Sequence, residues 1–138
     1  MTACSIALRP SWRLAALLAG IHAGALAAAV ASVPGWALVL IAVGILVSAA
    51  ASVADALLAL PSSVRELELE EDGSGRWRDR AGLEHPVRSA RPSWVSPGLV
   101  VLGLQGARRR TRWLVLMGDS AAAEPLRRLR VWLKWRRA

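Results

Sequence analysis

The chain has 138 residues and carries 18 Lys and Arg against 10 Asp and Glu, a formal net charge of +8. Its single cysteine, Cys4, excludes an intrachain disulfide and a cysteine-based metal site. The basic excess indicates an acidic partner, whether nucleic acid, anionic lipid or acidic protein, although small domains held under a membrane are commonly basic as well.

A long apolar region without charge dominates the first part of the chain. Residues 14–54 contain no Asp, Glu, Lys or Arg, and Val33-Pro34-Gly35 interrupts them near the middle. Because a membrane span needs roughly 20 apolar residues, this length suffices for two spans. We predict a transmembrane helical hairpin over 14–60, with helices at Leu14–Val33 and Trp36–Ala54 and the turn at 33–35.

The charges that flank the hairpin predict its orientation. Arg9 and Arg13 lie in the basic segment 1–13, and the other 16 basic residues follow Val64. Because Lys and Arg favour the cytoplasmic side, we expect both termini to be cytoplasmic. The stretch Ala29–Ser32 also resembles a signal-peptide cleavage site, but the apolar run is long for a signal peptide and a second span follows almost at once.

Two features of the first span are candidates for interactions. Gly20 and Gly24 have the GxxxG spacing that lets helix backbones approach closely, which allows a homodimer through this face. His22 is the one titratable residue of the apolar region, and neither span holds a carboxylate partner for it. We therefore expect a neutral imidazole that lies near the headgroups or bonds to a backbone carbonyl, rather than a functional group.

After Pro61 the hydrophobic period changes from helical to two, which indicates strands. Residues 64–70 alternate apolar and charged side chains, and a second alternation follows a glycine-containing turn. Pairing Leu69 with Trp77 would place glutamates opposite arginines. This register needs a three-residue bulged loop, which we predict at Asp72–Ser74.

Three more strands complete the predicted sheet. Residues 83–90 form a weak edge strand interrupted by Pro86. Trp94–Gln105 is apolar on both faces, so it is either a central strand covered on both sides or one that touches the membrane. It forms a hairpin with a strand at Arg112–Met117. Residues 61–138 are therefore predicted to be a cytoplasmic α+β domain, with an antiparallel sheet of about five strands and a C-terminal helix.

The last segment predicts a basic amphipathic helix that begins around Ala122. Its basic side chains could lie in solvent or touch headgroups, dock an acidic protein beside exposed tryptophans, or bind nucleic acid. Nucleic acid is the least favoured, because no recognised nucleic-acid-binding motif is present. The candidate partner-binding residues are Arg127, Arg128, Arg130, Trp132, Lys134 and Trp135.

No sequence pattern indicates catalysis. The chain contains no nucleophile elbow, phosphate loop, HxxxH or CxxC motif. The glutamates of 64–70 are typical of a solvated strand face, and His85 stands beside Pro86 on an expected edge. We therefore expect a protein without enzymatic activity, cofactor or metal.

Four blocks follow one another in a specific order. They are the two-span hairpin, Ser93-Trp94-Val95-Ser96-Pro97-Gly98-Leu99-Val100-Val101-Leu102, then Leu114-Val115-Leu116 with Asp119-Ser120, and finally Arg127-Arg128-Leu129-Arg130-Val131-Trp132-Leu133-Lys134-Trp135. Together they resemble the YgfX-like family, also called the membrane-bound toxin CptA family, over essentially the whole chain. Two positions depart from the expected pattern, namely Pro125 at the helix start and Gly103 on a central strand.

The resemblance implies a bacterial inner-membrane protein with two spans and a cytoplasmic domain, and it implies no catalytic residues. Members are described as partners of the small acidic protein that promotes FAD attachment to succinate dehydrogenase, and as toxins that interfere with cytoskeletal and division proteins. We thus expect a toxin-type membrane protein that binds cytoplasmic proteins. The alternative is a structural accessory whose basic domain clamps to anionic lipid or to a larger membrane complex.

Overall fold

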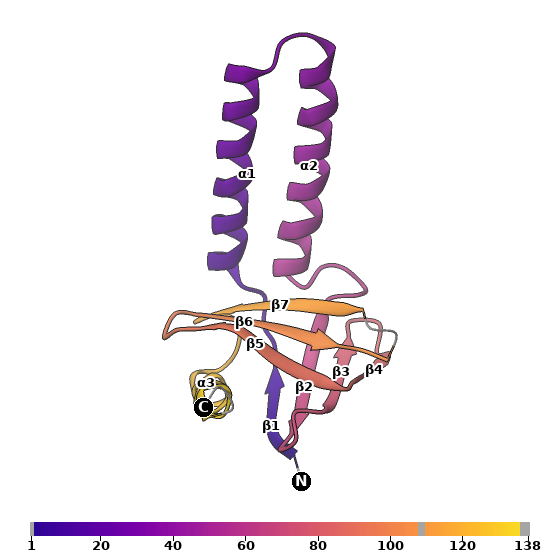
Figure 1. The fold of residues 1–138 in the computed structure, drawn as a ribbon, viewed down its shortest axis with the longest axis vertical. Coiled ribbons are helices and arrows are strands. Elements are labelled where there is room, and N and C mark those ends of the chain that lie inside the picture. Colours follow the sequence, from indigo (N-terminus) through magenta and orange to yellow (C-terminus); the bar gives the residue numbers. More distant parts are fainter. Residues whose placement is uncertain (1, 108–109, 136–138) are drawn as a thin grey trace.

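The computed structural model describes residues 2–107 and 110–135. Two long helices stand side by side above a small β domain, and the described chain begins and ends in that domain (Figure 1). In chain order the elements are β1 (Thr2–Ala7), α1 (Trp12–Ser32), α2 (Trp36–Ala56), β2 (Val64–Glu70), β3 (Gly75–Asp79), β4 (Glu84–Val87), β5 (Ser89–Val95), β6 (Leu99–Gln105), β7 (Thr111–Met117) and α3 (Ala123–Trp135).

The helices α1 and α2 form the predicted hairpin. Each has 21 residues and is long and apolar enough to cross a membrane. The helix α1 starts at Trp12 and α2 ends at Ala56, each two residues beyond the helix limits predicted at Leu14 and Ala54. Between the helices Gly35 takes a left-handed φ of 66°, which a glycine adopts without steric cost. Most side chains outside the contact between the two helices are exposed, as contact with lipid requires.

The polar and glycine positions of the first span differ in their surroundings. A Cβ built on Gly20 or Gly24 would meet no atom within 4 Å, so these glycines do not pack on α2 and the homodimer stays a prediction. His22 has its Nδ1 2.7 Å from the carbonyl oxygen of Leu18 and its Nε2 3.1 Å from the hydroxyl of Ser48. A neutral ring satisfies both bonds by donating from Nδ1 and accepting at Nε2, and the expected bond to a backbone carbonyl is confirmed.

The β domain contains two antiparallel sheets, so the prediction of one sheet of about five strands was wrong. The strand orders are β1-β2-β3-β4 and β5-β6-β7. The segment 1–13 supplies β1, whose small uncharged residues gave little strand signal beside the flanking arginines. The predicted strand at 83–90 is in fact β4 and the beginning of β5, which belong to different sheets and meet at Arg88.

The pairing of β2 with β3 is shifted by two residues from the predicted register, since Leu67 rather than Leu69 lies opposite Trp77. Charges still alternate across the outer face of this sheet, because each arginine of β3 contacts a glutamate of β2. The nitrogen–oxygen distances are 2.6 Å for Arg76–Glu68, 3.1 Å for Arg78–Glu66 and 2.6 Å for Arg78–Glu84. Exposed pairs of this kind contribute little stability each.

The turn between β2 and β3 explains the shifted register. The N–H of Glu70 donates to the carbonyl oxygen of Ser74 at 2.8 Å, which encloses residues 71–73, and Gly73 has a φ of 87°. The three-residue loop with a left-handed glycine is therefore confirmed, but it lies one residue earlier than Asp72–Ser74. Moving such a loop by one residue moves the strand pairing by two.

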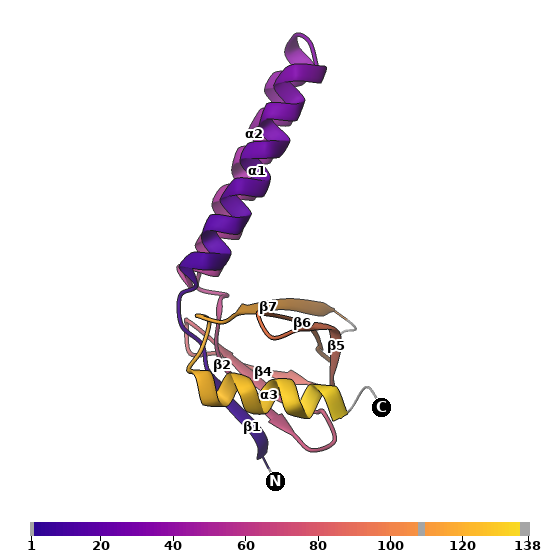
Figure 2. The same cartoon turned by 90° about the vertical axis from the view of Figure 1, so that its left-hand side faces the viewer.

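The two sheets and α3 enclose one hydrophobic core. The helix α3 lies against β1 and β5 at the open side of the two layers (Figure 2). Its predicted apolar face is confirmed, because Leu126, Leu129 and Leu133 are buried. The other fully buried large side chains come from both sheets and are Ile6, Leu67, Leu69, Leu102, Leu104 and Leu116.

The substitution Gly75→Ala should lower the free energy of unfolding by at least about 2 kcal/mol. An added Cβ would lie 2.0 Å from the carbonyl oxygen of Glu68, and Gly75 has a φ of 158°. The matched control is Gly98→Ala, whose Cβ would meet nothing within 4 Å. Denaturant unfolding in detergent, followed by circular dichroism, measures both variants, and equal stability of the two would contradict the described β2–β3 pairing.

Candidate functional site

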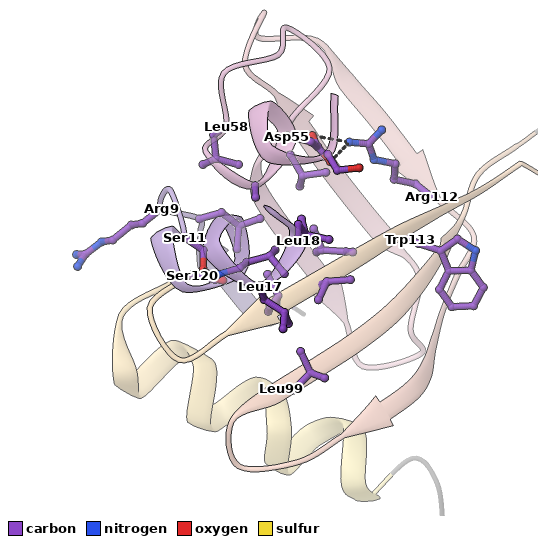
Figure 3. Close-up of a pocket in the computed structure, with 18 residues that line it drawn as sticks. Arg9, Ser11, Leu17, Leu18, Asp55, Leu58, Leu99, Arg112, Trp113 and Ser120 are labelled. Atoms are coloured by element: carbon purple, nitrogen blue, oxygen red, sulfur yellow. Dashed lines mark hydrogen bonds and ion pairs between the residues drawn. The ribbon is translucent and has the colours of Figure 1, made fainter. Parts of the chain in front are cut away.

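An ion pair joins the last turn of α2 to the start of β7. The Nη2 of Arg112 lies 2.9 Å and 3.0 Å from the two carboxylate oxygens of Asp55 (Figure 3). Ser63 donates to the same carboxylate at 2.7 Å. The Nε of Arg112 is buried and has no hydrogen-bond partner among the described residues. The guanidinium is thus partly removed from water, and loss of Asp55 would leave its charge uncompensated.

The other end of β7 is joined to the start of α1. Ser11, the N-cap of α1, donates from its hydroxyl to Asp119 at 2.6 Å and accepts from the N–H of Leu14 at 3.1 Å. The N–H of Arg13 donates to the second carboxylate oxygen of Asp119 at 3.1 Å. Both spanning helices are therefore held by polar bonds at the two ends of one strand.

The chain leaves α2 through a Schellman motif. The N–H of Leu58 donates to the carbonyl of Asp55 at 2.9 Å, and the N–H of Ala59 donates to that of Ala54 at 2.8 Å. Leu58 takes the left-handed position with a φ of 53°, where glycine is usual. Arg80 donates to the carbonyls of Leu58 and Ala59 at 3.2 Å and 2.7 Å. These bonds fix the direction in which the hairpin leaves the domain.

A hollow of about 330 Å³ lies between the base of the hairpin and the β5–β7 sheet (Figure 3). Its walls are mostly apolar, and Asp55, Arg112 and Ser11 are among its polar lining residues. The apolar side chains come from α1 and from the outer face and edge of the sheet, and they include Leu14, Leu17, Leu18, Leu99, Trp113 and Val115.

A second hollow, a groove of about 450 Å³, runs beside α3. The turn between β5 and β6 forms one wall, and two basic residues of α3 border the other. Arg130 donates to the carbonyl of Pro97 and to that of its own helix at Leu126, which fixes its position at the groove. The lining residues are Val95, Ser96, Pro97, Arg130, Val131 and Lys134.

The structure divides the six predicted partner-binding residues among different surroundings. Arg130 and Lys134 line the groove, and Trp135 is 77% exposed at the end of the described helix. Trp132 packs against the core instead of standing free for a partner. The groove therefore brings together two of the predicted residues, with Trp135 on the same helix.

The first two arginines of α3 are engaged by an acidic residue of their own helix. Arg127 and Arg128 each lie 3.0 Å from the carboxylate of Glu124. Hydrogen bonds from Arg127 and Arg128 lower the pKa of Glu124 to about 2. The charge of these two arginines is thus partly neutralised, in contrast to that of Arg130 and Lys134.

Sequence reasoning missed the residues that join the hairpin to the domain. No sequence pattern predicted a distant partner for Asp55 or for Asp119, although Asp119 belongs to one of the family-like blocks. One signal could have revealed the first pair, because Arg112 occupies the same face of its strand as Leu114 and Leu116. An arginine in an inward position predicts an acidic partner.

The described part of the chain offers little chemistry for a cofactor. No group of three or more His, Cys, Asp and Glu within 2–107 and 110–135 could hold a metal ion. His85 bonds to Asp79 at 2.9 Å and stacks on Trp77, with ring centres 4.0 Å apart. This bond is the main reason that the pKa of Asp79 lies below its usual value. The cluster lies within one sheet, where it supports the pairing of β3 with β4.

Comparison with known proteins identifies one family. A family model described as the membrane-bound toxin component of a toxin-antitoxin system matches residues 2–137. The match therefore covers the hairpin, both sheets and the described part of α3. Comparisons with curated proteins and with solved structures give no match.

A double-mutant cycle measures the bond between the hairpin and β7. Asp55→Ala and Arg112→Ala should each lower the free energy of unfolding by about 1 to 2 kcal/mol, because each leaves the other charge without its partner. The two effects should couple by at least about 0.5 kcal/mol. The exposed pair Glu68 and Arg76 provides the control cycle, with a smaller coupling. Additive effects at Asp55 and Arg112 would contradict a structural role for this pair.

The bond between Asp119 and α1 should depend on pH. Burial raises the pKa of Asp119, but hydrogen bonds from Ser11 and from the N–H of Arg13 lower it further, so the net pKa is below its usual value of 3.8. The ionised carboxylate therefore favours the folded state above that value, and the contribution is lost as the pH falls through the lowered pKa. Carbon NMR of the carboxyl should follow this titration, and Ser11→Ala should move the pKa of Asp119 upward. An unchanged pKa would contradict the bond.

Proposed function

Since the chain belongs to the family of membrane-bound toxin components of toxin–antitoxin systems, we propose that it binds soluble proteins at the membrane surface through the groove beside α3, without catalysis. The groove carries this proposal, because it combines an apolar floor with two cations at its border. Arginine and tryptophan are enriched among the residues that dominate the binding energy of protein interfaces. Arg130 borders the groove.

Charge supports an acidic protein as the partner. Residues after Val64 include sixteen basic and nine acidic side chains. Within α3, Arg130 and Lys134 border the groove, and no acidic side chain of the described residues lines it. Complementary charge across such an interface accelerates association and selects against basic competitors. The proposed partners are the acidic flavin-attachment factor of succinate dehydrogenase and cytoskeletal or division proteins, as the family resemblance implies.

We further propose that the hairpin lies in a bacterial inner membrane, with the β domain and both termini in the cytoplasm. Arg9 and Arg13 next to the first span favour this orientation, as do the sixteen basic residues that follow the hairpin. In this orientation the groove would face the soluble proteins that it is proposed to bind.

The alternative function is a structural accessory whose basic domain clamps to anionic lipid or to a larger membrane complex, and a lipid clamp through α3 has less support. Figures 1 and 2 both place the β5–β7 sheet between the hairpin and α3. The basic helix is therefore separated from the plane of the membrane by a layer of protein. This arrangement favours a protein partner for α3, since soluble proteins can approach it from the side opposite the hairpin.

Two pairs of substitutions on α3 test the groove. Arg130→Gln with Lys134→Gln should reduce retention of the purified acidic partner by at least about tenfold, since interface charges of this kind are worth a few kcal/mol together. The matched control is Arg127→Gln with Arg128→Gln, which removes the same charge from the arginines bound to Glu124. Titration of the partner onto the full-length protein in nanodiscs gives both affinities.

The two pairs of substitutions also distinguish binding of the partner at the groove from nonspecific attraction of the partner to the basic helix. Loss of affinity with the first pair alone supports the groove. Equal losses with both pairs would indicate nonspecific charge attraction, and no loss with either pair would exclude the groove as the binding surface. Growth arrest on controlled expression of the same variants then shows whether toxicity follows partner binding.

A further inference from the structure

The β5–β7 sheet presents an apolar face that the described chain leaves largely open. Residues that point into the core alternate along its strands with residues that point the other way. Val100, Leu102 and Leu116 are at most 2% exposed on the inner side. On the outer side, Trp94 and Trp113 are 58% and 59% exposed. An antiparallel sheet in water normally carries polar side chains on such a face.

A glycine on the central strand leaves room for the side chain of Trp113 on the outer face. Gly103 lies opposite Trp113 on β7 and opposite Arg91 on β5. A Cβ at Gly103 would lie 3.3 Å from the ring of Trp113 and 3.0 Å from the methyl group of Thr111. A larger residue would therefore displace the indole ring. The departure at Gly103 is explained by the space that Trp113 needs against the sheet.

The position of this face follows from the bonds that hold the hairpin. Because α1 and α2 are attached at the two ends of β7, the strand lies directly at the level where both spans end (Figures 1 and 2). The hollow at this level is lined by Leu17 of α1 together with Leu99 and Val115 of the sheet. Leu17 is 48% exposed on the spanning helix. The lipid-facing surface of α1 and the outer face of the sheet thus meet in one hollow.

The charge of the surrounding segment matches an anionic surface. Residues 85–118 contain no Asp or Glu and six arginines. Because Arg112 is bound to Asp55, the basic excess of this segment comes from the other five, namely Arg88, Arg91, Arg108, Arg109 and Arg110. Each basic residue near an anionic leaflet contributes about 1 kcal/mol of attraction. Tryptophan is also the residue type that is enriched at the level of the headgroups.

We propose that the outer face of the β5–β7 sheet is a second membrane-contact surface, which lies on the anionic phospholipid headgroups around the hairpin with Trp94 and Trp113 at the interface. The occupant of this face is the bilayer that the hairpin crosses. The domain then has a fixed orientation, with α3 on the side of the sheet that faces away from the hairpin (Figure 2). This proposal does not depend on the partner proposed for α3.

Spin labels on the full-length protein test the proposal. Cys4→Ala provides a background without cysteine, and a label is placed at Val101→Cys on the outer face. The control label is at Glu84→Cys, on the exposed face of the other sheet. The protein is reconstituted at one copy per nanodisc in equal parts of phosphatidylcholine and phosphatidylglycerol. Collision rates with oxygen and with a water-soluble nickel chelate report whether each label meets lipid or water.

We expect the label at Val101 to favour oxygen over the nickel chelate several-fold more than the control label. Equal accessibility at the two positions would show that the face lies in water and would overturn the proposal. Exclusion of both reagents would show that protein covers the face, which would also overturn it. A second copy is excluded as the cover by the reconstitution at one copy per nanodisc.

Tryptophan fluorescence gives an independent measurement with a milder change. Brominated phospholipid should quench the native protein, and part of this quenching should be lost in Trp94→Ser. The matched control is Trp135→Ser, which removes an exposed tryptophan of α3 and should leave the quenched amplitude unchanged. Equal quenching in Trp94→Ser and in the unchanged protein would overturn the proposal even if the labelled variants fold poorly.

Discussion

The polar bonds at the two ends of β7 determine how the membrane hairpin and the domain are arranged. The hairpin itself contains no charge between residues 14 and 54 and can contact lipid in any rotation about its axis. Because α1 and α2 have the same length, the start of α1 and the end of α2, which adjoin the β domain, lie at one level. A strand of seven residues spans roughly 20 Å, which is enough to reach both helices when they are packed about 10 Å apart. One strand can therefore hold both helices.

This attachment determines which surface of the domain meets which partner. With β7 at the level of the hairpin ends, its sheet becomes the layer nearest the membrane, and the second sheet and α3 lie beyond it (Figure 2). An arrangement in which α3 faced the lipid would require breaking the bonds of Asp55 and Asp119. The specificity of the polar contacts thus matters more than their modest contribution to stability.

The parts of the fold that the sequence predicted are those with a single physical explanation. An uncharged run of 41 residues with a central Pro-Gly has no stable position in water, and the apolar spacing of α3 fits only a helix. The register of β2 and β3 has more than one explanation in the sequence, because a shift of two residues keeps every side chain on the same face of the sheet. It also keeps glutamates opposite arginines, so only the geometry of the turn at Gly73 decides between the registers.

The missed elements depend on contacts between distant segments. The strand β1 pairs with β2, although the whole hairpin separates them in the sequence, and no local pattern in Thr2–Ala7 predicts this pairing. Asp55 and Arg112 are 57 residues apart, and each has an ordinary local explanation at a helix end or at a strand start. Local sequence patterns therefore predict most elements of this protein, but neither the strand β1 nor the contacts between distant segments.

The distribution of charge argues that the basic excess serves two surfaces instead of one. On the outer face of the β1–β4 sheet, Arg76 and Arg78 are matched by glutamates, and Glu124 holds Arg127 and Arg128. Apart from Arg112, which Asp55 holds, the arginines of the segment 85–118 have no acidic residue within that segment, and Arg130 and Lys134 stand at the end of α3. The helix α3 lies on the side of the β5–β7 sheet that faces away from the hairpin (Figure 2). An acidic protein at α3, as proposed, would therefore not have to displace lipid from the outer face of the sheet.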